Sequence, residues 1–168
     1  EGEAVTESDQ TLGQIRMTPH TIGARTTISR RTLLQSAIAI EPFVRGDLGA
    51  LLATAMDAAA INGSGPAGQP LGVLNTSGIG SVTLNAASTP PWGDIVDLET
   101  AIATDNALMG NLAYITNSTI AGNMKQTTKD SGSGLFLLDK DWTNGYKCGV
   151  SNNVPAKHIL FGNWSYLI

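Results

Sequence analysis

Apolar residues between positions 43 and 61 recur every three or four places, the spacing that lines one face of an α-helix. We therefore predict one long helix over residues 41–61. Pro42 lies in its first turn, where a missing N–H is tolerated, and Asn62-Gly63 is expected to supply a left-handed residue at its end, before Pro66. The predicted apolar face consists of Val44, Leu48, Leu51, Leu52, Ala55, Met56, Ala59 and Ala60.

The stretch before this helix follows a different pattern. Apolar and β-branched residues alternate over residues 11–32, which is more typical of strands than of a helix. Pro19 and Gly23 interrupt the alternation, so we predict a pair of extended, partly exposed strand segments rather than part of a central sheet. Ser29 is expected to open a short helical turn that leads toward the long helix.

Helices and strands are predicted to alternate in the second half of the chain. Asp94 is the expected N-cap of a second helix, whose apolar face includes Ile95 and Leu98. A short buried strand follows over residues 112–116. Either Asn117 or Ser118 is expected to cap a third helix, which carries Ile120 and Met124.

A tight-turn dipeptide, Asn144-Gly145, organises the rest of this half. It places residues 135–138 and 146–151 as the two strands of a hairpin. A last strand begins at Ile159 and continues beyond Gly162. One long helix followed by this mixture of helices and strands indicates the α+β class.

Composition narrows the possible functions. The chain has 168 residues and 42% hydrophobic content, which suits one compact body with an appendage. Charged residues make up only 14% and the net charge is −4, so direct binding to nucleic acid is disfavoured. No apolar run reaches the roughly 18 residues of a membrane span, and synthesis in a cytoplasm is the expectation. Because the chain lacks an initial methionine and ends within an apolar run, we expect a piece of a longer protein.

Candidate chemical groups are few. Cys148 is the only cysteine and is expected to be a small buried hydrophobe; with His20 and His158 it offers no zinc-ligand spacing. Residues 131–134 lack the glycine spacing of a nucleophile elbow, and His158 is expected to be a surface or satisfied residue rather than a base. We therefore predict no catalytic, cofactor-binding or metal-ligating residues, and no cofactor.

Residues 63–68 match the dinucleotide pattern G-x-G-x-x-G. That motif needs a strand before it and a helix N-terminus after it, whereas here a helix precedes and Pro66 and Pro70 follow. We interpret the stretch as a helix end and a sharp turn. A small cytoplasmic nucleotide-binding enzyme built on this loop stays as the alternative from another functional class.

Several segments, in this order and spacing, resemble the major capsid proteins of tailed bacteriophages of the Hong Kong 97 type. The resemblance extends over roughly residues 11–166. The matching segments are ISRRTLLQS (28–36), AAAINGSG (58–65), GQPLGVLN (68–75), WGDIVDLE (92–99), LAYITN (112–117), MKQ (124–126), NGYKCGVSN (144–152) and ILFGNWS (159–165).

The resemblance implies a Hong Kong 97-like α+β capsid fold in three parts. Residues 1–28 would be the remnant of an extended loop, residues 29–70 a partial peripheral domain with the spine helix, and residues 71–168 an axial domain. The family's N-terminal arm and the C-terminal segment that returns beside the spine helix are missing here. That leaves the apolar face of the helix short of partners.

The function implied is that of a structural virion protein, not an enzyme. The full-length subunit would form pentamers and hexamers of an icosahedral shell around phage or prophage DNA, without membrane or sequence-specific nucleic-acid binding. It would be made in the bacterial cytoplasm and reside in the virion capsid. Scaffold, protease and portal proteins are the further partners implied. An encapsulin-like compartment is the alternative within this class, and whether this chain alone is monomeric stays open.

Overall fold

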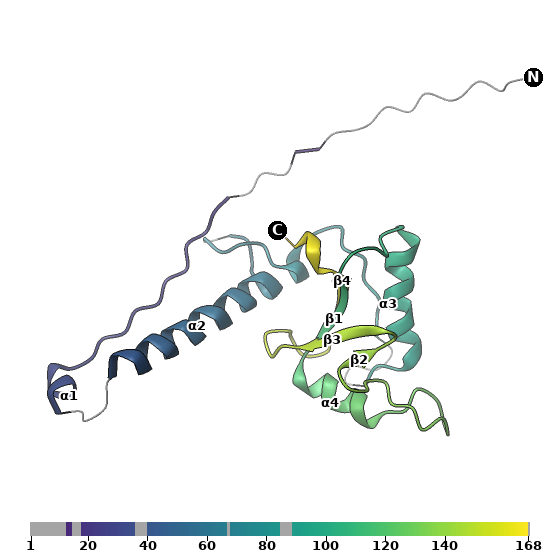
Figure 1. Ribbon diagram of the computed structural model, residues 1–168. Helices are drawn as coiled ribbons and strands as arrows, with labels where there is room; N and C mark the ends of the chain where they lie inside the picture. Colours follow the sequence, from purple (N-terminus) through teal and green to yellow (C-terminus); the bar gives the residue numbers. More distant parts are fainter. Residues whose placement is uncertain (1–12, 15–17, 36–39, 67, 85–88, 168) are drawn as a thin grey trace, which may run out of the picture.

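The computed structural model describes residues 13–14, 18–35, 40–66, 68–84 and 89–167. One long helix is followed by a mixture of helices and strands, as Figure 1 shows. In chain order they are α1 (Arg30–Gln35), α2 (Ile40–Asn62), η1 (Val73–Asn75), α3 (Trp92–Thr104), β1 (Leu112–Thr116), α4 (Ser118–Gln126), β2 (Trp142–Thr143), β3 (Tyr146–Val150), β4 (Ile159–Asn163) and η2 (Trp164–Tyr166), where η marks a short 3-10 helix.

A four-stranded mixed sheet forms the centre of the second half. Its strand order is β2-β3-β1-β4; β1 runs parallel to β3, and the other two pairs are antiparallel. The parallel pair needs a crossover, and α4 lies within it. The α+β class is confirmed. Figure 1 shows α2 projecting from the body that the sheet, α3 and α4 form.

The predicted long helix is confirmed, with Pro42 in its first turn. The expected left-handed residue at its end is wrong: neither Asn62 nor Gly63 has a positive φ, and the first such residue after α2 is Gly65. Gly63 instead continues the helical pattern, because its N–H donates to the Ala59 carbonyl at 2.9 Å. The helix end is stabilised from outside by the turn that follows.

That turn brings two backbone segments into direct contact. The Gly72 N–H donates to the Gly63 carbonyl at 2.8 Å, and the Asn75 side-chain amide donates to the same carbonyl at 2.9 Å. Asn75 is the last residue of η1. The carbonyls that a helix leaves unpaired at its C-terminus therefore find partners in this turn.

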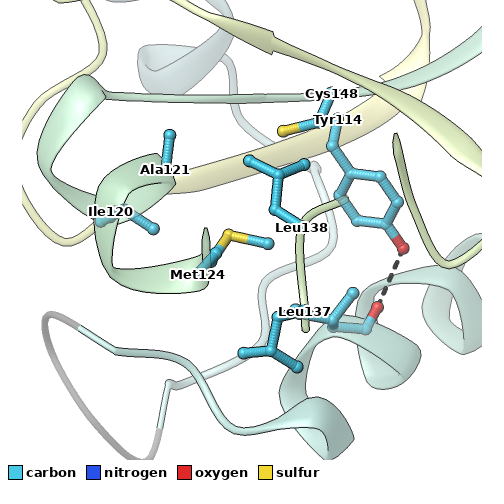
Figure 2. Close-up of a cluster of buried hydrophobic side chains, with 8 residues drawn as sticks. Tyr114, Ile120, Ala121, Met124, Leu137, Leu138 and Cys148 are labelled. Carbon is cyan, nitrogen blue, oxygen red and sulfur yellow. Dashed lines mark hydrogen bonds between the residues drawn. The ribbon is translucent and has the colours of Figure 1, made fainter. Parts of the chain in front are cut away.

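The core lies between the sheet, α3 and α4. Figure 2 shows the ring of Tyr114 directed toward α3, where its hydroxyl donates to the Ile95 carbonyl at 3.0 Å. Ile120, Ala121 and Met124 of α4 close the opposite side. The other members of the buried cluster are Leu137, Leu138 and Cys148.

The strand predicted over residues 112–116 and the helix after it are confirmed. Asn117 is the N-cap of α4, and its side-chain oxygen accepts the Ile120 N–H at 2.8 Å. Asp94, however, is not the N-cap of α3. Pro91 holds that position, and Asp94 lies buried in the first turn. The helix starts earlier than predicted because Trp92 packs against the core cluster.

The predicted partner of β3 is also wrong. Asn144 and Gly145 have positive φ and make the expected tight turn, but the strand they join to β3 is β2. Residues 135–138 pair only through an isolated bridge between Phe136 and Thr128. Leu137 and Leu138 are both buried, and two consecutive buried side chains do not fit the alternation of a two-sided strand.

Three further predictions concern the ends of the chain. The predicted strand segments are wrong for residues 18–29, which contain no strand and lie exposed, with Ile22 at 44% and Ile28 at 41% exposure. Positions 11–12 and 15–17 lie outside the described part of the chain. The helical turn after Ser29 is confirmed as α1, and the Ser29 hydroxyl accepts the Thr32 N–H at 3.1 Å. The last strand ends at Asn163, whose side chain accepts the Ser165 N–H and turns the chain into η2.

Candidate functional site

The glycine-rich stretch does not form a phosphate-binding loop. Helix α2 precedes it, and the only helical element close behind it in the described chain is the three-residue η1. Gly65 and Gly68 have positive φ and form the turn, which an isolated bridge between Ser64 and Leu71 closes. Among the described residues the next α-helix begins only at Trp92, so the dinucleotide interpretation loses its geometric basis.

The candidate chemical groups are separated or buried. His158 is exposed, and its Nδ1 lies 2.9 Å from the Ala156 carbonyl. Cys148 is buried in the core, and burial raises the pKa of its thiol to about 11. Within the described residues, no three His, Cys, Asp or Glu side chains are grouped to hold a metal ion. The helices in that part of the chain are also too short or too polar to cross a membrane.

The first extended candidate surface is the apolar face of α2. Of the helix, only Ile61 is buried, whereas on this face Leu51 is 55% exposed and Met56 60%. A groove of about 620 Å³ lies along this face, and Ile28 of the extended segment forms its far side. Its remaining lining residues are Glu41, Val44, Arg45, Leu48, Gly49 and Leu52.

The charges beside this groove are satisfied locally. Arg45 donates to Glu41 at 2.7 Å, one helical turn away, and both side chains are about 80% exposed. Such a pair contributes little stability, because water and salt screen it. The groove itself is therefore an apolar surface with a small polar rim. It is built to contact another apolar surface rather than a charged ligand.

A second apolar surface lies beside β2, an edge strand of the sheet, and we call it the tip patch. It consists of Leu135, Phe136 and Trp142, all more than 45% exposed, around a hollow of about 440 Å³. Lys129 lines this hollow, and its ammonium lies 4.2 Å from the ring centre of Trp92. That distance permits a cation–π contact, which ties the segment after α4 to the start of α3.

A polar network holds the hairpin turn beneath the tip patch. Glu99 of α3 accepts the Tyr146 hydroxyl at 2.7 Å and also accepts the side-chain amide of Asn144. The hydrogen bond to Glu99 raises the pKa of Tyr146. Sequence reasoning missed Glu99, because its spacing on α3 differs in no way from that of an ordinary surface carboxylate.

The structure thus contains two exposed apolar surfaces, one along α2 and one at the tip patch, and no grouped chemical site within the described residues. The whole chain, residues 1–168, matches the model of the Phage capsid family, and it belongs to that family. It is 33% identical over all 168 residues to the major capsid protein of Halomonas phage phiHAP-1.

Two solved capsids share the fold. The capsid chains of the native and of the empty GTA particle, each determined with C5 symmetry, both align with a TM-score of 0.63 and 25% identity over 81% of this chain. The alignment covers 53% of each of those chains, and the match to the phiHAP-1 protein covers 27% of its length. The chain therefore corresponds to a part of its relatives.

Proposed function

We propose that the protein containing this chain is the major capsid subunit of a tailed phage or prophage, a structural protein without catalytic activity. The relation to a major capsid protein over every residue of the chain supports this proposal. The structural observation that carries it is the fold, which the capsid chains of the GTA particles share with a TM-score of 0.63. Burying one Leu side chain is worth about 1.5–3 kcal/mol, so the exposed apolar face of α2 strongly favours a covered state in the whole protein.

The subunit would act mechanically. Head-to-tail contacts between identical subunits close into rings when the rotation closes, and rings of five and six tile an icosahedral shell. Each contact can be modest, because every subunit is held by several neighbours at once. The GTA chains are parts of assembled particles, which supports an oligomeric role for this chain too.

The parts of the chain would divide this work. Residues 29–70 would form part of the peripheral domain, with α2 as its spine, and residues 71–168 the axial domain. Residues 1–28 would be the remnant of an extended loop. In the whole protein, the face of α2 would be covered by segments outside this sequence, because the relatives are longer than this chain. The tip patch would contact the axial domain of a neighbour.

Location and partners follow from the same proposal. The subunit would be made in the bacterial cytoplasm and would reside in the virion capsid. Scaffold, protease and portal proteins would be its transient or minor partners. With a net charge of −4, the wall would not hold DNA strongly, which suits packing and release.

The experiment is to express the full-length protein and examine it by sedimentation and electron microscopy. Particles of uniform size are expected, and DNA or a cargo enzyme inside them would separate a phage shell from an encapsulin-like compartment. Leu51→Glu should reduce the particle yield at least tenfold. Ala53 lies about 200° around the helix from Leu51, so Ala53→Glu should leave the yield unchanged.

Failure of the full-length protein to form any particle would contradict the proposal. Far-UV circular dichroism of the soluble subunit checks that each variant still folds. Saturable nucleotide binding in the micromolar range, lost in Gly65→Val, would instead support the nucleotide-binding alternative.

A further inference from the structure

The outer edge of β4 is open. The Trp164 N–H donates to the Asn111 carbonyl at 3.0 Å, one position beyond the pair formed by Asn163 and Leu112. Because bonded and non-bonded pairs alternate in an antiparallel ladder, the backbone groups of Ile159, Phe161 and Asn163 point away from β1. They point toward a side of the sheet on which no strand is present in the described chain.

Residues 79–84, which we call the strap, lie beside this edge. Residues of the strap and of 157–160 line one cavity of about 290 Å³, and Ile79 and Gly80 with residues 159–164 line a second of about 240 Å³. Ile79 and Gly80 line both cavities, whereas Ser81, Val82 and Leu84 line only the first. The strap therefore reaches the end of β4 with its first residues alone, as an antiparallel course requires. No hydrogen bond joins the strap to β4 in the described chain.

The strap has the sequence pattern of a strand. Val82 and Leu84 are half-buried, whereas Ser81 and Thr83 between them are exposed. Alternation of this kind, with β-branched residues, is typical of a strand with one buried face. An unpaired strand edge beside an unpaired strand-like segment is an arrangement that direct pairing would complete.

We propose that the strap closes onto β4 as a fifth, antiparallel strand when the subunit is built into a shell. In the paired state Gly80 lies opposite Asn163, Val82 opposite Phe161 and Leu84 opposite Ile159, which keeps Gly80 beside the end of β4 with which it already shares a cavity. These β4 residues are the ones whose backbone groups point outward. Directly opposite residues share a face, so Val82 and Leu84 join the side on which Ile159 and Phe161 pack against the core.

Closure would also fix the long helix relative to the sheet. At one end the strap follows η1, which Asn75 ties to the end of α2. At its other end the chain reaches the buried Pro90 and then α3. A further direct link is a hydrogen bond of 3.3 Å from the Asn153 side chain to the Thr54 carbonyl. Pairing the strap with β4 therefore sets the angle at which α2 leaves the body. This role rests on the proposed capsid function.

A disulfide in the full-length protein tests the register. In the closed state Thr83 and Leu160 form a non-hydrogen-bonded pair with Cα atoms about 4.5 Å apart, within the range of a disulfide. The double variant Thr83→Cys with Leu160→Cys is expected to cross-link in assembled particles, and more slowly in the soluble subunit. The matched control, Ser81→Cys with Leu160→Cys, is displaced by two positions and should not cross-link.

Hydrogen exchange of the unmodified protein provides the second measurement. Peptides covering the strap and β4 should exchange at least tenfold more slowly in particles than in the soluble subunit. Unchanged exchange in the strap, or equal cross-linking of the control pair, would overturn the inference. If no particles form, the capsid proposal fails, whereas cross-linking of the soluble protein still reads the register of the strap on its own.

Discussion

Gly63 and Gly72 lie against each other with no room for a side chain between them. The Gly72 N–H donates to the Gly63 carbonyl at 2.8 Å, and a Cβ on either residue would overlap the backbone of the other segment. Neither residue has a positive φ, so these glycines are required by close approach and not by backbone conformation. Their contact fixes the turn by which the chain leaves α2.

Gly72→Ala isolates this steric effect, because alanine can adopt the same backbone angles. We expect the variant to lose about 1–3 kcal/mol in the free energy of unfolding, since one backbone segment must shift. Chemical denaturation followed by circular dichroism measures the loss. Gly46→Ala is the control: no atom lies near its Cβ, and alanine within α2 should stabilise by about 0.5–1 kcal/mol. Equal effects of the two variants would refute the close-approach explanation.

Asn117 has two roles at the junction of β1 and α4. Its oxygen caps the helix at the Ile120 N–H, and its amide donates to the Pro155 carbonyl at 3.3 Å. Asn117→Ala should cost about 0.5–2 kcal/mol of stability, whereas Asn117→Asp should keep the cap and lose only the second bond. Thr119→Ala, at an exposed neighbouring site, is the matched control for denaturant unfolding. An aspartate variant as unstable as the alanine variant would show that the cap is not the important contact.

Burial of Tyr114 makes stability depend on alkaline pH. Desolvation raises the pKa of its hydroxyl from 10.0 to about 12. Because the unfolded chain releases this proton first, the stabilisation is complete below pH 10 and is lost as pH rises from about 10 to 12. Tyr114→Phe should flatten this part of the stability profile. At neutral pH it should cost about 0.5–1.5 kcal/mol, for the lost bond to Ile95.

Thermal unfolding between pH 8 and 12 measures the profile. The control is Tyr166→Phe, because Tyr166 is 70% exposed near the end of the described chain. An unchanged slope in Tyr114→Phe would mean that other groups cause the alkaline loss.

Cys148 should be unreactive in the folded chain. Its side chain is buried in the core, and burial together with Asp141 raises the pKa of the thiol to about 11, so little reactive thiolate forms at neutral pH. Labelling with a thiol reagent should proceed at least a hundredfold faster in denaturant than in buffer. Rapid labelling of the native chain would show that the sheet opens around β3.

The elements with strong local signals were predictable. The spacing of apolar residues predicted α2, the short apolar run predicted β1, and Asn117 and Asn144-Gly145 carried their own cap and turn chemistry. In each case, neighbouring residues supply both the conformation and its hydrogen-bond partners. The resemblance in ordered segments also identified the Phage capsid family, which the whole-chain match confirms.

Local signals failed where distant packing decided the outcome. Leu137 and Leu138 resemble a strand in sequence, yet both side chains enter the core between the sheet and the helices. Asp94 has the chemistry of an N-cap. Because Trp92 packs against the core cluster, however, the helix already begins at Trp92, and Asp94 lies within its first turn. Glu99 carried no signal, because its partners Asn144 and Tyr146 lie more than forty residues away.

By itself, the sequence determined the α+β class, the long helix with its apolar side, and the kinship with capsid proteins, because periodicity, caps and the order of segments are properties of the chain. Only the tertiary structure decided which apolar side chains are covered. The leucines of α2 and those at 137–138 are equally hydrophobic, but burial depends on what other segments lie nearby. The open edge of β4 and the exposed face of α2 are therefore properties of the three-dimensional arrangement.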